Sequence, residues 1–597
     1  MKLFEKLDVK GKIVSYDDFR FPVDRNEIPE AYKKSIRENA EKALATDVPM
    51  ILASQFREFV QNGNRVHMEA PYLARRNALT ALMLGEFTFD DGRYLDKMID
   101  YLWAICEEST WKLSAHNNHN SDEHFQLPVE FADDVFFIDL FAAQTGAFLA
   151  IAYRLFGKKL DEDCPVCVTK RIAYELDRRI FHPFERYGRE FWWSGCKGNY
   201  VNNWNPWIVA NILTTAAFAE KDMQKRETFT ATCCEMIDHF IGQLPEDGTC
   251  EEGPSYWGAA FGAVISFMEM LADVSGGRIQ TGSYDFLRAA AEYVPKMYVG
   301  DSRYVPFNDC PIRVMHDMAM LYRFGLMTHS RLLTDFAGET AKITPFHPNS
   351  TCPANVFRYI TTAIPAAVFN PERVYYLPSR KIMTVREEWN GHKLMIGAKA
   401  GSNNEGHGHL DCGNFVLYVD GEAVLIDAGS PTYCKDTFNE NRFKNWQMRS
   451  PYHNTAGVDE LEQGYGGKFR ADDVNFEEGV LSFELKNTFT DPDGIVSLRR
   501  VIDTRDGFDV TDTFSFEAER TYRFYLLTIV KPLETEGKIT IGGAAFVFTP
   551  NAAVSVETVD DSHDRRAAEA YHTANLYRTT FSVRAKEGKF TFALAKQ

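Results

Sequence analysis

Residues 401–429 read GSNNEGHGHLDCGNFVLYVDGEAVLIDAG, and this stretch indicates how the second part of the chain folds. After residue 413 two apolar, β-branched-rich runs flank Asp420-Gly421. An Asp-Gly pair between two such runs is the strongest short-range signal for a two-residue β-hairpin. The stretch therefore predicts a hairpin in which Asn414 pairs with Asp427.

The period of two continues to the end of the chain. From about residue 375 onward, runs such as KLMIGAKA, GVLSFELKN, YRFYLLTIV and KITIGGAAFVFT alternate or are rich in β-branched residues. Asp506-Gly507 gives a second hairpin signal. We expect residues 376–597 to form an antiparallel β-sandwich of many strands.

Before that point the apolar pattern is helical. Pairs of helical segments, such as NPWIVANILTTAAFAE followed by FTATCCEMIDHFIGQL, recur at intervals, and in several pairs the first member is apolar nearly all round. A helix that is apolar on every side is buried on every side, so the first members are expected to form an inner layer. Such hairpins build either an open solenoid or a closed toroid. Their irregular lengths and polar-aromatic loops favour an incomplete α/α toroid over residues 1–375, so the fold class is α+β with two domains.

Composition narrows the function. A chain of 597 residues is too long for one ordinary hydrophobic core, so more than one domain is expected. A net charge of −18 argues against nucleic-acid or anionic-membrane partners. Aromatic residues make up 13%, which suits either sugar stacking or large cores. Eleven cysteines without framework spacing, and no apolar signal core or bilayer-spanning run, lead us to expect reduced thiols and a cytoplasmic location.

The opening stretch also holds two histidines, and MRSPYHNTAGVD further along adds a third. His409, Asp427 and His453 together are an ordinary set of zinc ligands. From spacing alone, polar loop residues that bind no metal are the favoured interpretation, because the three lie far apart in the sequence. His407 is not part of this set and could act as a base. We expect Gly408 to let the backbone turn, so that the two neighbouring imidazoles diverge and do different work.

Three polar clusters lie in the helical half. YVNNWNPW places Asn202, Asn203 and Trp204 before an apolar helix, where the amides could cap the helix or donate to a carboxylate. EDGTCEEGPSYWG places Glu252 and Tyr256 at another helix start. WKLSAHNNHNSDEHFQLP, which contains His124, is interpreted as a polar rim loop. No GxSxG, P-loop or dinucleotide motif is present.

These motifs, in this order, resemble the heparinase II/III superfamily of polysaccharide lyases, which includes oligoalginate lyases. NNWN resembles the family's NNH motif, EEGPSYWG its EGxxY motif, HGHLDCGNF its HxHxDxGxF signature and YHNT its HNT motif. The resemblance implies β-elimination at a uronic acid and strengthens the zinc interpretation of His409, Asp427 and His453. The zinc would be structural, because elimination needs no hydrolytic nucleophile.

The resemblance also implies roles for single residues. Asn203 would neutralise the substrate carboxylate, Tyr256 would protonate the departing O4, and Tyr256 or His407 would remove the C5 proton. Trp204 stands where many members have a histidine, and an indole cannot accept that proton; it is expected to stack on a sugar ring. The remaining predicted substrate contacts are Asn202, Glu252 and His124.

Two other functions stay open from the sequence. An α/α-toroid glycoside hydrolase would need two carboxylates flanking the bond, for which Glu251, Glu252 and Asp309 are the candidates. An inactive sugar-binding protein is the third reading, which the presence of both Tyr256 and His407 disfavours. The expected partner is a uronate-containing oligosaccharide; the identity of the sugar and a homodimeric assembly are left open.

Overall fold

The computed structural model describes residues 3–116, 137–162, 167–279, 285–341, 351–434, 436–437, 439–535 and 537–596. The chain forms two compact units. The helical unit comprises Met1–Leu244, Gly258–Tyr284 and His316–Val368, and the β unit comprises Pro245–Trp257, Asp285–Met315 and Phe369–Gln597. The predicted fold class, helix hairpins of an incomplete α/α toroid followed by antiparallel β-sheets, is confirmed.

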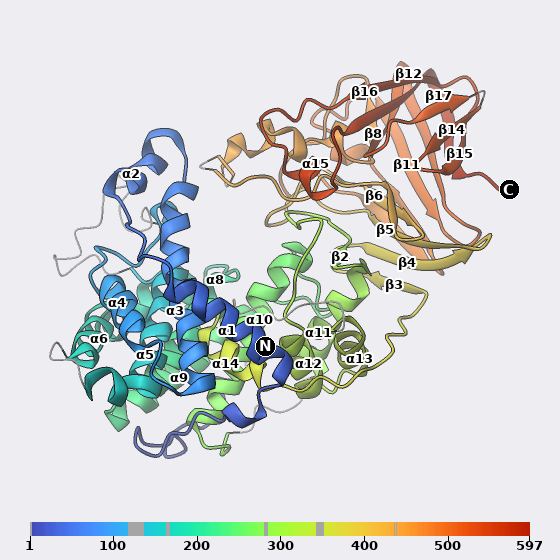
Figure 1. Ribbon diagram of the computed structural model, residues 1–597. Coiled ribbons are helices and arrows are strands. Elements are labelled where there is room, and N and C mark those ends of the chain that lie inside the picture. The colour runs from blue at the N-terminus through green and yellow to red at the C-terminus, as the bar shows by residue number, and fades with distance from the viewer. Residues whose placement is uncertain are drawn as a thin grey trace. The chain divides into compact units, whose positions relative to one another are not determined.

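The first part of the chain is built from successive helices (Figure 1). Their bounds are α1 Glu30–Leu44, α2 Ala53–Asn62, α3 Val66–Phe89, α4 Leu95–Cys106, α5 Leu140–Glu162, α6 Val168–Leu176, α7 His182–Tyr187, α8 Trp204–Ala219, α9 Met223–Ile241, α10 Gly253–Val274, α11 Asp285–Met297, α12 Met318–Met327, α13 Arg331–Thr340 and α14 Pro353–Ile360. Three of the expected hairpins form, with α3 packed on α4, α5 on α6 and α8 on α9, and α12 packs on α13.

The inner layer follows from the sequence pattern. Helices α3, α5 and α8 pack one on the next, and most residues of α8 are buried around its whole circumference. Two helices, α5 and α10, are long and apolar enough to cross a membrane, which corrects the expectation that no run reaches that length and composition. In the structure 72% and 78% of their apolar windows are buried inside the protein, as core helices are.

The β unit holds two principal sheets. One has the strand order β3-β4-β5-β6-β7, and the other runs β13-β14-β15-β17-β12-β11-β10-β9, with β8 on β12 and β16 on β17. The strand bounds are β3 Val374–Leu377, β4 Ile382–Trp389, β5 His392–Lys399, β6 Phe415–Val419, β7 Glu422–Leu425, β8 Ala456–Val458, β9 Asp472–Glu477, β10 Val480–Glu484, β11 Ile495–Asp503, β12 Asp509–Thr528, β13 Leu533–Thr535, β14 Lys538–Ile541, β15 Ala544–Phe548, β16 Ala553–Thr558 and β17 Tyr577–Leu594.

Side chains from both sheets share one core, which makes the unit a sandwich. The rings of Phe415 in β6 and Phe524 in β12 lie 6.0 Å apart within a cluster of buried apolar residues from the two sheets. The long strands β12 and β17 run antiparallel side by side (Figure 1). A short helix, α15 (Arg566–Ala570), precedes β17.

Earlier segments of the chain complete this unit. A small hairpin, β1 (Tyr298–Gly300) with β2 (Arg303–Tyr304), follows α11 where the sequence pattern predicted continued helix. Backbone carbonyls in this region accept hydrogen bonds from β4: the Thr384 hydroxyl donates to the Lys296 carbonyl at 3.0 Å, and the Arg386 guanidinium donates to the Tyr298 carbonyl at 2.6 Å. These side-chain bonds between distant segments explain why residues 285–315 belong to the β unit.

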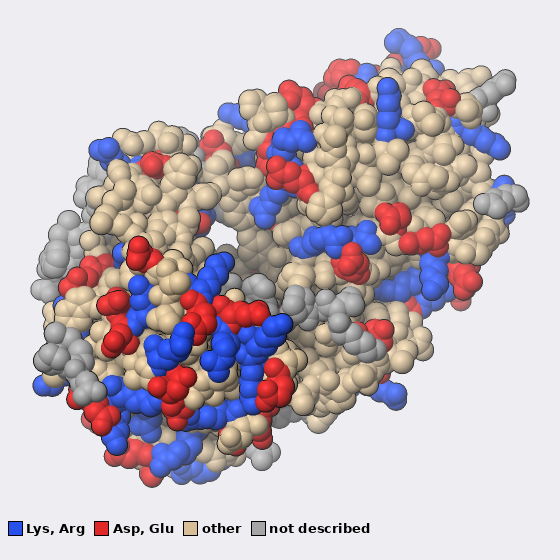
Figure 2. Space-filling view, viewed as in Figure 1, with Lys and Arg blue, Asp and Glu red and all other residues tan. Residues whose placement is uncertain are grey.

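The surface mixes charges of both signs. On the face shown in Figure 2, lysine and arginine alternate with aspartate and glutamate over the helical unit, and no large area of one sign dominates. The ten cysteines of the described segments are all free thiols.

Candidate active site

A single buried carboxylate, that of Asp309, organises the polar cluster of the β unit. Its Oδ2 lies 2.8 Å from His407 Nδ1 and accepts a 3.0 Å hydrogen bond from the Tyr433 hydroxyl. Its Oδ1 lies 3.2 Å from His409 Nε2 and accepts a 2.7 Å bond from Arg442. Burial alone would raise the pKa of Asp309, but the bonds from the two histidines and the charge of Arg442 outweigh burial and lower it. Asp309 is therefore an ionised anchor for four donor side chains.

Two phenols and one imidazole meet beside this anchor. The Tyr256 hydroxyl, from the first turn of α10, donates to the Tyr433 hydroxyl at 2.8 Å, and the Tyr433 hydroxyl in turn donates a hydrogen bond to Asp309. The rings of Tyr256 and His407 lie 4.5 Å apart, and His407 Nδ1 is 3.1 Å from the Tyr433 hydroxyl. Burial, and then the charge of Asp309, raise the pKa of Tyr433, so this phenol stays protonated. The structure thus brings the predicted residues Tyr256 and His407 into direct contact.

Glu252 completes the surroundings of His407. Its Oε2 lies 3.3 Å from His407 Nε2. Burial raises the pKa of Glu252 to about 7. Burial opposes the charged imidazole, yet the hydrogen bond to Asp309 and the charge of Glu252 raise the pKa of His407. Near neutral pH the Glu252 carboxyl can therefore gain or lose a proton beside the imidazole, which is the property that acid–base catalysis needs.

The loop backbone explains how the two histidines reach one carboxylate. His407 itself adopts a left-handed conformation with φ of 57°, so the turn lies at the histidine and not at Gly408 as predicted. Gly408 is needed for another reason: a Cβ there would lie 2.9 Å from the Glu405 carbonyl oxygen. The His407 carbonyl accepts from the Asp309 backbone N–H at 3.1 Å, which fixes the loop against the segment carrying Asp309.

The predicted hairpin positions the second cluster. Asp420 and Gly421 both have positive φ values, of 50° and 84°, and they connect β6 to β7 as expected. The Asn414 amide donates to the Asp427 carboxylate. Asp427 therefore lies at the open end of the hairpin, as predicted. A bulge at Leu417/Tyr418 shifts the ladder, so Asn414 and Asp427 meet through their side chains and not as the predicted register pair.

His409, Asp427 and His453 converge at this end. One ligand atom from each lies within 4.8 Å of the others, and all three side chains are fully buried. His453 Nδ1 contacts Asp427 Oδ2 at 3.0 Å, whereas His453 Nε2 and His409 Nδ1 are buried with no hydrogen-bond partner in the described residues. A buried, unpaired imidazole nitrogen is costly unless something binds it. The donor set and its unpaired nitrogens fit a zinc ion.

The charge states of Asp427 and His409 agree with such a site, whereas His453 must release a proton when a metal binds. Despite its burial, the pKa of Asp427 is lowered to about 2 by His453 and His409, so the carboxylate is ionised. Burial lowers the pKa of His409, which keeps this imidazole neutral and able to bind a metal. For His453, burial is outweighed by Asp427, which raises its pKa.

In the helical unit, the asparagine cluster begins α8. Asn203 is the residue before the helix, is buried, and makes no capping bond through its side chain. The side-chain Oδ1 of Asn202, in contrast, accepts from the Trp204 backbone N–H at 3.1 Å. The indole of Trp204 contacts the aromatic rings of Trp192, His116 and Phe137, at 5.0, 4.7 and 6.3 Å between centroids. His116 Nδ1 is held 2.7 Å from the buried Asp139. Helix capping therefore explains Asn202 but not Asn203.

Sequence reasoning missed part of this arrangement. Tyr433 and Arg442 were not singled out, and Asp309 was considered only as a hydrolase carboxylate. The signal for Asp309 is its place in FNDCP after a short hairpin, but no spacing rule links it to His407, about a hundred residues later. The predicted substrate residue His124 lies outside the described residues.

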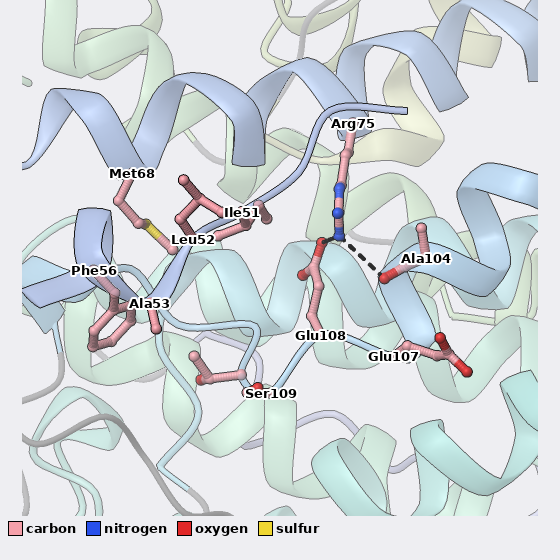
Figure 3. A pocket seen from close by; sticks show the side chains of 11 residues that line it. Ile51, Leu52, Ala53, Phe56, Met68, Arg75, Ala104, Glu107, Glu108 and Ser109 are labelled. Carbon is pink, nitrogen blue, oxygen red and sulfur yellow. Dashed lines mark hydrogen bonds and ion pairs between the residues drawn. The ribbon is translucent and has the colours of Figure 1, made fainter. Parts of the chain in front are cut away.

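A separate hollow opens in the helical unit, beside α2 and α4 (Figure 3). It has a volume of about 340 Å³, and its principal charged groups pair with each other: Arg75 donates to Glu108 at 3.0 Å and to the Ala104 carbonyl at 3.1 Å. Arg76 also binds Glu108, at 2.7 Å. The charged groups of the hollow are thus paired with each other where the helices pack. We therefore take the Asp309 cluster as the candidate active site.

Comparison with known proteins finds a family model that matches the part of the chain carrying many of these residues. Residues 388–591 match the model "Heparinase II/III-like, C-terminal". This segment includes His407, His409, Asp427, Tyr433 and His453. An exo-oligoalginate lyase of Saccharophagus degradans is 24% identical over 313 residues, a match that covers 48% of this chain and only 40% of that protein.

Solved structures show the same fold along nearly the whole chain. A heparinase III aligns with a TM-score of 0.60 at 14% identity, covering 98% of this chain and 87% of the other. A mutant of the heparan sulfate lyase HepC from Pedobacter heparinus gives 0.57 at 14%, covering 99% and 87%. The chondroitin AC lyase of Streptomyces coelicolor gives 0.50 at 10%, covering 95% and 83%. The resemblance to the heparinase II/III superfamily is confirmed, and the chain has the fold of these polysaccharide lyases.

Proposed function

We propose that this chain, with its heparinase II/III-like sandwich, is a carbon–oxygen lyase that cleaves uronate-containing oligosaccharides by β-elimination. The product would carry a C4–C5 double bond at its new non-reducing end. The observation that carries the proposal is the convergence of the Tyr256 phenol and the His407 imidazole, with ring centroids 4.5 Å apart, on the ionised Asp309.

The reaction needs a base for the C5 proton and an acid for the departing O4. Tyr256 and His407 adjoin each other, so one substrate carbon and its leaving oxygen can meet both groups. In the structure the Tyr256 hydroxyl donates to Tyr433, and it would turn to O4 during the reaction. Proton transfer by positioned groups contributes roughly 10²–10⁴-fold to rate.

Asp309 and Glu252 set the proton positions on His407. An ionised Asp309 at 2.8 Å favours the proton on Nδ1. Nε2 then faces Glu252, whose pKa of about 7 lets it hold or release a proton near neutrality. Glu252 is therefore assigned a positioning role toward His407, in addition to the substrate contact predicted from the sequence.

The asparagine loop before α8 keeps the substrate roles that the resemblance implies. We assign the amide of Asn203 to the uronate carboxylate, where extra negative charge builds up as the C5 proton leaves. Trp204, with Trp192 and His116 around it, offers aromatic faces on which a pyranose can stack. Asn202 supports this loop through its bond to the Trp204 backbone.

His409, Asp427 and His453 would hold a zinc ion. Such an ion would supply no catalytic water; it would fix the loop that presents His407. No step of the elimination is assigned to it. The proposal also includes a cytoplasmic location and the formation of a homodimer.

Hydrolysis is the competing reaction, and the Asp309 geometry disfavours it. A glycosidase needs two carboxylates free to reach the bond and water. Asp309 is fully buried and binds four side-chain donors, and Glu251 is paired with Arg380 at 3.0 Å. Of the three candidate hydrolase carboxylates, this leaves Glu252, which lies beside His407.

A panel of uronate oligosaccharides incubated with the purified protein tests the reaction. Mass spectrometry should find that the newly formed uronate-ended fragment is one water lighter than the hydrolysis product, with ultraviolet absorbance from the new double bond. Fragments that have gained a water would instead identify a hydrolase.

A further inference from the structure

A second group of metal-binding side chains lies in the helical unit, away from the sandwich. Cys196, Glu235 and His239 each offer one ligand atom, and these atoms lie within 4.8 Å of one another. Glu235 and His239 are four residues apart on α9, so their side chains emerge on the same face of the helix. Cys196 comes from the loop after the 3-10 helix Trp192–Ser194. Two separate segments of the chain therefore present their ligand atoms to one point.

The backbone is shaped to allow this approach. Gly195 has a φ of 74°, and a Cβ at this position would lie 2.5 Å from the Cβ of His239. Only glycine permits the loop to pack so closely against α9. The Ser194 hydroxyl accepts from the Cys196 backbone N–H at 3.2 Å, which holds the thiol toward the helix. Cys196 Sγ then lies 4.0 Å from Glu235 Oε1.

We propose that Cys196, Glu235 and His239 form a second zinc site, in which a thiolate, a carboxylate and an imidazole bind the ion and water fills the fourth position. A thiolate with an imidazole is a donor pair that selects zinc over magnesium or calcium. With bonds of about 2.0–2.3 Å, tetrahedral ligand atoms lie roughly 3–4 Å apart, so small side-chain rotations complete the site.

Arg189 occupies part of this site in the structure. Both of its terminal nitrogens contact the Glu235 carboxylate, one at 2.6 Å. Arg189 is 54% exposed, so it can give up one carboxylate oxygen to a metal and keep its charge in water at little cost. The guanidinium thus neutralises the carboxylate while no metal is bound.

The site has a structural consequence for the asparagine loop. The chain runs from Cys196 through an irregular segment directly into Asn202, Asn203 and Trp204 at the start of α8. The Asn205 amide already donates to the Met236 carbonyl of α9 at 2.9 Å. A zinc ion on Cys196 would fix the other end of this loop to the same helix. The site stands independently of the reaction proposed above.

Cobalt substitution tests the site without an activity assay. Cobalt bound to a thiolate gives a near-ultraviolet charge-transfer band, and the His409–Asp427–His453 site contains no thiolate. The full chain loaded with cobalt should show this band. It should disappear in Cys196→Ser, weaken in His239→Gln, and persist in the matched control Cys167→Ser and in His409→Ala.

Zinc content gives the second measurement. We expect about two zinc ions per wild-type chain and about one in Cys196→Ser. Circular dichroism should find the Cys196→Ser protein folded. An unchanged cobalt band in Cys196→Ser, or a wild-type chain whose zinc is lost entirely in His409→Ala and fully kept in Cys196→Ser, would overturn the proposal.

Discussion

His407 and His409 bind opposite oxygens of the same buried carboxylate. His407 Nδ1 lies 2.8 Å from Asp309 Oδ2, and His409 Nε2 lies 3.2 Å from Asp309 Oδ1. Beyond this shared anchor their surroundings differ: His407 adjoins Tyr256 and Glu252, whereas His409 adjoins Asp427 and His453. One carboxylate thus links the proposed acid–base group to the proposed metal-binding group.

Tyr256→Phe removes one hydroxyl from the acid–base group and nothing else. We expect turnover on a uronate oligosaccharide to fall by roughly 10²–10⁴-fold, because the proton donor to O4 is lost. The thermal midpoint should change little. Tyr174→Phe, at an exposed tyrosine of the helical unit, is the matched control. Near-normal turnover in Tyr256→Phe would assign the acid to another residue.

Tyr433→Phe tests the relay between Tyr256 and the anchor. The variant loses the 3.0 Å bond to Asp309 and the acceptor for the Tyr256 hydroxyl. A hydrogen bond to a charged group contributes about 1.5–3 kcal/mol, so kcat should fall roughly 10–100-fold. Because Tyr433 positions Tyr256 and touches no substrate in this account, KM should stay within a few-fold. A raised KM with unchanged kcat would make Tyr433 a substrate-binding residue instead.

The pH dependence of stability should report Glu252. Burial raises its folded-state pKa to about 7, above the ordinary 4.5, so the folded state binds the extra proton between these values. Stability from this group is complete below about pH 4.5 and declines as the pH rises through about 7. Glu252→Gln has no carboxyl group at this position, so its stability does not decline in this way as the pH rises. Its thermal midpoint relative to wild type should therefore increase from pH 5 to pH 8, and a constant difference would contradict the shifted pKa.

His409→Ala should lose the proposed zinc of the sandwich and lower the thermal midpoint together, because the ion would join the His409 loop to the segments after β7 and before β8. Activity should fall as a consequence, through misplacement of His407. His392→Ala, at a partly exposed histidine of β5, is the control and should keep its metal. Retention of that zinc in His409→Ala would show that the ligand assignment is wrong.

Local pattern predicted what depends on local structure. The period-3.6 segments became α3, α5 and α8 with their partners, and Asp420-Gly421 formed the hairpin that places Asn414 beside Asp427. The pattern did not predict β1 and β2, because their strand character depends on pairing and on contacts with β4. The pattern did not predict Tyr433, Arg442 or the anchoring role of Asp309, because burial, not spacing, gives these residues their roles.

Transfer of the C5 hydrogen tests the central claim most directly. A uronate oligosaccharide carrying deuterium at C5 should lose that deuterium to solvent on cleavage, and kcat/KM should show a primary isotope effect when proton removal limits the rate. The account predicts that the wild-type chain forms an unsaturated product without deuterium. The Tyr256→Phe variant should form almost no cleaved product. A cleaved product that keeps its C5 deuterium would contradict β-elimination.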